Sequence, residues 1–343
     1  MKVAFFESNK WEVKISKKNY QKYLKNNLEK HKLIFFNESI EKEVKSKNKE
    51  IEAIVVFYSS KIDKNIIDNL PNLKLITTMS TGFDHIDVNY CNQKKIKICN
   101  IPKYGSNVVA EHTFALILSL SRKIYDSIKR TRENHSFKSD ERLMGFELKG
   151  KILGLIGYGS IGQNVSKIAN GFGMKTIVYD IKKNEKLAEK NNIKYVSFEE
   201  LIKKSDIISL HAPYNESTHH ILNTSIFEKM KKGVYIINTA RGGLIDTFAL
   251  VSAIKNKIVK GAALDVLEEE SDFKEEIEIL DKIELCNEKC RILLEDLILM
   301  KMDNVIITPH NAYNSVESKE RILNTTIENI NSFNKNKIKN CIN

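Results

Sequence analysis

The sequence predicts an α/β protein with two doubly wound parallel sheets. Short apolar runs of strand length alternate with segments of helical spacing from the first residues onward, and a second series of the same kind begins near residue 152. This alternation favours parallel sheets, because parallel strands need helical crossovers that cover both faces of the sheet. A chain of 343 residues is long enough to give each of two domains its own hydrophobic core.

The two series of apolar runs predict twelve strands. Lysine- and glutamate-rich segments with leucine, isoleucine and tyrosine at helical spacing separate the early runs, so we expect helices as the crossovers. The first sheet is expected to contain residues 3–6, 33–36, 53–57, 75–78 and 96–99. The second is expected to contain residues 152–156, 176–179, 195–196, 207–210, 235–238, 261–264 and 305–308.

The longest helical segment, residues 106–131, lies between the two series. Its middle is apolar on nearly all sides, so we expect burial between domains or against a second subunit, and we favour a homodimer. Residues 316–333 also have helical apolar spacing and are expected to pack back on the first domain. We therefore expect a discontinuous first domain of residues 1–101 and 314–343, and a second domain of residues 102–313 that includes the dimerisation helix.

Composition is that of an ordinary soluble globular protein, 42% hydrophobic and 29% charged. The net charge of +11 (55 − 44) comes from lysines spread among asparagine, isoleucine and glutamate, so we expect no nucleic-acid surface.

The longest apolar run, about residues 114–120, is too short for a membrane span, and the apolar start is too short for a signal peptide. An odd number of cysteines, five, indicates free thiols in a reducing compartment, so we expect a cytoplasmic protein. Cys286 and Cys290 have no histidine or further cysteine beside them, so we expect no metal site.

A glycine-rich turn over residues 157–162 predicts a dinucleotide site. The run G-Y-G-S-I-G follows an apolar strand and opens a helix, so its glycines permit a tight turn, close approach of a pyrophosphate and close helix packing. Asp180 ends the next strand, 18 residues beyond Gly162, where a carboxylate binds ribose hydroxyls. Because a carboxylate there repels a 2′-phosphate, we expect NAD rather than NADP.

Three ionisable side chains follow three expected strands of the second sheet: Arg241, Asp265 and His310. Ligands of open α/β sheets bind outside the carboxyl ends of the strands, so these side chains are expected at the mouth that holds the cofactor. A guanidinium fork binds a carboxylate in two places, and an imidazole exchanges a proton with a carbonyl oxygen. The set predicts hydride transfer between NAD and a small 2-hydroxy acid or its 2-oxo acid.

Several segments in this order resemble one family. They are residues 80–87, 101–112, the glycine turn with Asp180, and residues 211–213, 238–242, 265–270 and 308–310. Over nearly the whole chain, the sequence resembles the D-isomer-specific 2-hydroxyacid dehydrogenases, and within them the D-lactate dehydrogenase branch. The resemblance implies a flavodoxin-like substrate domain and a Rossmann NAD domain with a cleft between them.

The resemblance also implies catalytic roles. Arg241 is expected to bind the substrate carboxylate and carbonyl, and His310 is expected to be the general acid/base. Glu270, five residues after Asp265, is expected to pair with His310 in preference to the two glutamates before it. Asp265 is expected to tune the pH response and to position the arginine or the nicotinamide.

Substrate and cofactor contacts follow from the same resemblance. Backbone N–H groups of Thr81 and Gly82 are expected to hold the carboxylate, and Tyr104 and Tyr313 to contact the substrate. The residues expected at the cofactor are Tyr158, Gly159, Ser160, Ile161, Asp180, His211, Ala212, Pro213, Thr239, Ala240, Arg241 and Asp265.

The implied reaction is the reversible reduction of pyruvate by NADH to D-lactate. Gly105 and Ser106 replace the Ser-Pro pair expected after Tyr104, which leaves the side-chain pocket open to a second interpretation. A bulkier acid of the 2-oxoisocaproate or phenylpyruvate type is that alternative. A second alternative is a non-catalytic protein that senses NAD.

Overall fold

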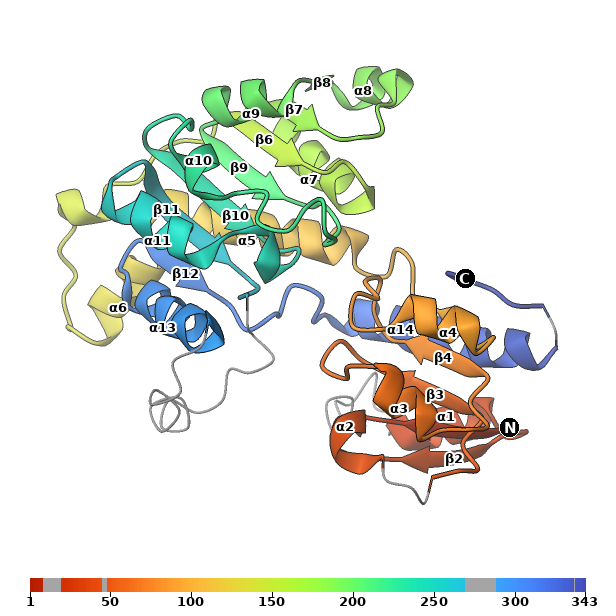
Figure 1. The fold of residues 1–343 in the computed structure, drawn as a ribbon. Helices are drawn as coiled ribbons and strands as arrows, with labels where there is room; N and C mark the ends of the chain where they lie inside the picture. Colours follow the sequence, from red (N-terminus) through yellow and green to blue (C-terminus); the bar gives the residue numbers. More distant parts are fainter. Residues whose placement is uncertain (9–19, 45–47, 269–287, 336) are drawn as a thin grey trace. The chain divides into compact units, whose positions relative to one another are not determined.

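The structure is a computed structural model that describes residues 1–8, 20–44, 48–268, 288–335 and 337–343. The chain forms two compact units, Met1–Tyr104 with Asn314–Asn343, and Gly105–Tyr313 (Figure 1). Each unit is built on a parallel sheet, which confirms the predicted fold class. All twelve expected strands are present, and their ends differ from expectation by two residues at most.

The first unit holds a five-stranded sheet in the order β2-β1-β3-β4-β5, the flavodoxin-like order. Every neighbouring pair is parallel. The strands are β1 (Lys2–Phe5), β2 (Lys32–Phe35), β3 (Ala53–Val56), β4 (Leu75–Thr78) and β5 (Lys97–Cys99). β3 and β4 are buried along their whole length, as expected for inner strands covered on both faces.

Helices accompany this sheet, and the last of them comes from the end of the sequence. They are α1 (Tyr20–Asn27), α2 (Ile40–Glu43), α3 (Lys64–Asp68), α4 (Val88–Gln93) and α14 (Val316–Asn334). Asp63 and Asp87 cap α3 and α4 by accepting a backbone N–H in the first turn. α14 packs against β4 and buries Ile322, Leu323 and Ile330, so the two separated stretches of sequence share one unit.

The second unit holds a seven-stranded parallel sheet in the order β12-β11-β10-β9-β6-β7-β8. The strands are β6 (Ile152–Ile156), β7 (Lys175–Tyr179), β8 (Ile193–Tyr195), β9 (Ile207–Leu210), β10 (Val234–Asn238), β11 (Val259–Leu264) and β12 (Val305–Ile307). The chain runs outward from β6 through β7 to β8 and then returns to β9 on the other side of β6. This reversal creates a switch point between β6 and β9, where sheets of this class bind ligands.

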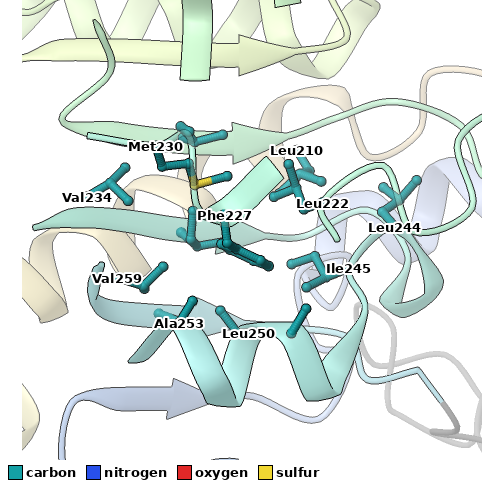
Figure 2. Close-up of a cluster of buried hydrophobic side chains, with 14 of the residues drawn as sticks. Leu210, Leu222, Phe227, Met230, Val234, Leu244, Ile245, Leu250, Ala253 and Val259 are labelled. Carbon is teal, nitrogen blue, oxygen red and sulfur yellow. The ribbon is translucent and has the colours of Figure 1, made fainter. Parts of the chain in front are cut away.

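Helices pack around this sheet, with buried apolar clusters against them. They are α5 (Ser106–Ser121), α6 (Ile124–Arg132), α7 (Ser160–Gly171), α8 (Glu185–Asn191), α9 (Phe198–Lys204), α10 (Thr224–Phe227), α11 (Thr247–Lys255) and α13 (Glu288–Lys301). Figure 2 shows Leu250 and Ala253 of α11 pointing toward Phe227 of α10 within one cluster. In the described parts of the chain, no helix combines the length and apolar character needed to cross a membrane.

The prediction of a single helix over residues 106–131 is wrong, because the structure has two helices there. Lys123 adopts a left-handed conformation, φ +54°, which ends α5 and starts α6 in a new direction. α5 buries half of its sixteen residues against its own unit, whereas α6 has no buried residue. The buried part of the expected dimerisation helix is therefore an internal element of the second unit.

Candidate functional site

The glycine-rich turn joins β6 to α7 at the switch point. Gly157 has φ +95°, and a Cβ there would lie 2.7 Å from backbone atoms of His211 and Ala212, so only glycine fits. A Cβ on Gly162 would lie 2.6 Å from the Gly157 carbonyl oxygen, which explains the close approach of α7. A Cβ on Gly159 would meet nothing within 4 Å, and no side chain caps α7. The open space before an uncapped helix N-terminus fits a pyrophosphate.

Asp180 closes this turn from the end of β7. Its carboxylate accepts the Tyr158 N–H at 2.6 Å and the Lys182 N–H at 2.7 Å. The Tyr158 side chain is 5% exposed, and its hydroxyl contacts Ser166 and Asn191 in the core. Tyr158 therefore reaches the turn only through its backbone, and the carboxylate stands beside the open space at Gly159.

The segment after β9 lies against the glycine turn. The His211 N–H donates to the Ile156 carbonyl at 2.7 Å, and its Nε2 lies 2.9 Å from the Ser209 hydroxyl. Burial lowers the pKa of His211 to about 3, so the ring is neutral at physiological pH. A neutral ring against Gly157 suits a wall of the dinucleotide site, formed with Ala212 and Pro213.

Arg241 lies on a turn after β10 that Asn238 holds. The Asn238 amide accepts the Ala240 N–H at 3.0 Å and donates to the Arg241 carbonyl at 2.8 Å. A Cβ on Gly242 would collide with the Leu267 backbone at 2.0 Å, so the turn must continue with glycine. Thr239 is buried, and its hydroxyl lies 3.0 Å from that of Thr113. Sequence reasoning missed Asn238 as the clamp, although an asparagine at a strand end is a typical turn-holding residue.

Asp265, 1% exposed after β11, organises the turn that carries His310. Its carboxylate accepts the N–H groups of Asn311 and Ala312, both at 2.8 Å, and the Thr308 hydroxyl. Burial would raise the pKa of Asp265, but its hydrogen bonds outweigh burial and hold the pKa below the ordinary value. His310 itself has φ +49°, and its N–H donates to the Asp265 and Thr308 carbonyls.

The ends of these strands are level. Asn238 of β10 pairs with Leu264 of β11, and Leu264 pairs with Ile307 of β12. The turns that carry Arg241, Asp265 and His310 therefore leave one edge of the sheet side by side. The Tyr313 ring lies 6.4 Å from that of His310, edge to face.

Three glutamates follow Asp265 at positions 268–270, and the structure describes only the first of them. Glu268 accepts hydrogen bonds from Thr247, at the start of α11, and contacts His220 Nε2. The Glu268 carboxylate is therefore engaged by the start of α11 and by the turn that carries His220. Glu269 and the expected catalytic Glu270 lie outside the described residues.

In the first unit, the turn after β4 offers backbone donors. The Thr81 carbonyl accepts the Asn100 amide at 2.8 Å, and the Gly82 carbonyl accepts the Ser80 hydroxyl at 2.6 Å. In the part of the chain that the structure describes, the N–H groups of Thr81 and Gly82 meet no protein acceptor. Two such N–H groups in succession suit a carboxylate.

Tyr104 ends the first stretch of this unit, and its carbonyl accepts Arg321 Nε of α14 at 2.9 Å. Among the described residues, no group of three or more His, Cys, Asp or Glu side chains is arranged to hold a metal ion.

Comparisons with known proteins agree with this geometry. A family model described as "D-isomer specific 2-hydroxyacid dehydrogenase, NAD binding domain" matches residues 114–312. The chain is 34% identical to a glyoxylate reductase of Thermococcus litoralis over 297 residues, 85% of this chain and 83% of that protein. It is 33% identical to a 2-hydroxyacid dehydrogenase homolog of Zymomonas mobilis over 335 residues, 96% of each. A solved D-lactate dehydrogenase from Aquifex aeolicus, complexed with NAD and lactic acid, is 38% identical with a TM-score of 0.85, over 98% of this chain and 96% of that chain.

Proposed function

The chain belongs to the D-isomer-specific 2-hydroxyacid dehydrogenase family, and from this premise we propose that it is a D-lactate dehydrogenase. It is an NAD-dependent oxidoreductase that acts on the CH–OH group of a 2-hydroxy acid. The proposed reaction is pyruvate + NADH + H⁺ ⇌ D-lactate + NAD⁺. The observation that carries the proposal is the level alignment of three strand ends that present Arg241, Asp265 and His310.

The chemistry divides among these residues. Bound NADH supplies the hydride to the carbonyl carbon of the oxo acid. The Arg241 guanidinium binds the substrate carboxylate and polarises the carbonyl, and the His310 imidazolium gives its proton to the carbonyl oxygen. In the reverse direction the neutral imidazole takes the proton back. Glu270 is assigned to favour the imidazolium, and Asp265 fixes the backbone on which His310 lies.

Further groups are assigned to the substrate. The N–H groups of Thr81 and Gly82 are proposed to donate to its carboxylate, and the lack of an acceptor for them among the described residues supports this. Tyr104 and Tyr313 are proposed to contact the side-chain end of the acid. In pyruvate that end is a methyl group. The similarity to a D-lactate dehydrogenase solved with lactic acid supports pyruvate as the substrate.

The cofactor assignments follow the switch point. Backbone N–H groups at Gly159, Ser160 and Ile161 are proposed to hold the pyrophosphate. Tyr158, whose N–H donates to Asp180, is proposed to border the cofactor through the backbone of the turn. Asp180 is proposed to bind the ribose hydroxyls. The remaining wall of the site is assigned to His211, Ala212, Pro213, Thr239 and Ala240.

Glyoxylate is a second candidate substrate, which the similarity to a glyoxylate reductase favours. A substrate panel separates it from pyruvate: NADH oxidation is followed with pyruvate, glyoxylate, 2-oxobutyrate, hydroxypyruvate, 2-oxoisocaproate and phenylpyruvate. We expect the highest kcat/KM with pyruvate. A higher value with glyoxylate, 2-oxoisocaproate or phenylpyruvate would replace lactate with the corresponding hydroxy acid and keep the reaction type.

A homodimer is also proposed, on the exposed C-terminal part of the expected dimerisation helix and the residues that follow it. α6 exposes Ile124, Tyr125 and Ile128, and Phe137 and Met144 follow it at 98% and 70% exposure. Apolar side chains gathered in one stretch of surface sequence support burial against a second copy. Sedimentation of the wild type as a dimer and of an Ile128→Asp variant as a monomer is expected, and a monomeric wild type contradicts the proposal.

We place the enzyme in the cytoplasm, which the free thiols of Cys91, Cys99 and Cys341 support. Fractionation of cells checks this location. Recovery of the protein from the secreted fraction contradicts it.

A further inference from the structure

α5 contributes an imidazole to the buried end of β11. His112 Nε2 lies 3.1 Å from Thr308 Oγ1 and 3.3 Å from Asp265 Oδ1, and the threonine hydroxyl donates to the same carboxylate oxygen. We propose that His112 is a positioning residue, which holds Asp265 and Thr308 and through them the backbone that carries His310. The inference rests on the proposed function, in which His310 exchanges the proton.

The Asp265 carboxylate is the point through which this effect passes. It is 1% exposed, and a buried carboxylate is stable only when hydrogen bonds replace the lost water. Two of its donors, the N–H groups of Asn311 and Ala312, belong to the residues directly after His310. A shift of the carboxylate therefore moves the backbone next to the proton-transferring imidazole.

The geometry fixes where His112 carries hydrogen. Nε2 faces a carboxylate oxygen, and a bare nitrogen lone pair there would be repelled by the carboxylate, so Nε2 carries the N–H. The Thr308 hydroxyl donates its hydrogen bond to Asp265, and its oxygen lone pairs accept the hydrogen bond from His112 Nε2. The three groups thus form a closed set of hydrogen bonds in which His112 is the outer donor.

α5 is a suitable support for such a donor. Leu116, Ile117 and Leu120 are buried, and the helix packs against β10 and β11. The next residue, Thr113, places its hydroxyl 3.0 Å from that of Thr239, on the strand end that leads to Arg241. One turn of α5 therefore contacts the strand ends that carry both the arginine and the histidine.

A matched pair of variants tests the inference. In His112→Gln the amide nitrogen reaches the position of Nε2, whereas in His112→Asn it falls one methylene short. We expect the single-turnover rate of NADH oxidation to stay within about 3-fold of wild type for His112→Gln. For His112→Asn we expect a fall of about 10-fold to 100-fold, the cost of a misplaced catalytic group. The solvent deuterium isotope effect should rise only in the asparagine variant, and KM for NADH should stay unchanged in both.

Controls separate this role from stability. Glu111→Gln, on the exposed side of the same helix, should leave the rate and the Tm as in wild type. Equal rates for the asparagine variant and wild type overturn the inference, as does an equal loss in both His112 variants that follows their Tm. If His112→Asn does not fold, Thr308→Val removes the linking hydroxyl, and a wild-type rate in that variant overturns the inference.

The His310→Ala variant, measured in parallel, distinguishes this inference from the proposed function. If His310→Ala keeps its rate, the proposed function fails. If His310→Ala loses its rate and His112→Asn does not, only the inference about His112 fails.

Discussion

The two sheets of this protein are built alike, yet different chemistry follows their strands. After β4, the first unit presents the backbone N–H groups of Thr81 and Gly82, and side chains there hold the turn. After β10, β11 and β12, the second unit presents a guanidinium, a buried carboxylate and an imidazole. The parallel architecture therefore supplies only the edge at which the strands end, and the residues that follow each strand decide the chemistry of that edge.

The largest effect is expected where the second sheet supplies the proton. His310→Ala should lower kcat by about 10²-fold to 10⁴-fold, because a positioned acid/base is lost. NADH affinity, measured by fluorescence titration, should stay unchanged, since the assigned cofactor contacts remain. A His310→Ala variant that keeps most of its kcat would contradict the proposal that the strand ends of the second sheet supply the proton.

Arg241→Lys tests the guanidinium. A lysine keeps the charge but loses the planar fork, so the two-point contact with the carboxylate becomes a single contact. We expect KM for pyruvate to rise about 10-fold to 100-fold, which corresponds to losing one charge-assisted hydrogen bond. Steady-state kinetics check this, and an unchanged KM would mean that another group binds the carboxylate.

Gly157→Ala tests the cofactor side of the second sheet. The added Cβ meets His211 and Ala212 backbone at 2.7 Å, in a conformation with φ +95°. We expect a loss of about 1–3 kcal/mol in the free energy of unfolding and about tenfold weaker NADH binding. Gly171→Ala in α7 is the matched control, because its Cβ meets nothing within 4 Å and alanine favours the helix. Similar behaviour of the two variants would contradict the assigned turn.

The smallest effect is expected in the first sheet. Thr81→Ala removes a hydroxyl that donates to the Ile101 carbonyl at 2.8 Å but keeps the backbone N–H. We expect KM for pyruvate to change by less than about 3-fold, with about 0.5–1.5 kcal/mol lost in the free energy of unfolding. A large rise in KM would show that the Thr81 side chain also binds the substrate. The first unit would then not differ from the second, which is proposed to bind the substrate through the Arg241 side chain.

Much of the fold could be predicted, because strand periodicity and strand-end residues are local features of the sequence. The break at Lys123 could not, since neither glycine nor proline marks it and its left-handed conformation depends on packing. The partners of Glu268 could not either, because spacing cannot reveal that His220 and Thr247 engage its carboxylate. Tyr158 was expected at the cofactor from its place in the glycine motif, and the direction of its side chain into the core was not encoded there.

The reaction that we propose for this chain is the reduction of pyruvate by NADH to the D isomer of lactate. Its most direct test is chiral analysis of the product formed by the wild-type protein from pyruvate and NADH. We expect D-lactate alone, in an amount equal to the NADH oxidised. Formation of L-lactate, or no lactate at all, would contradict it.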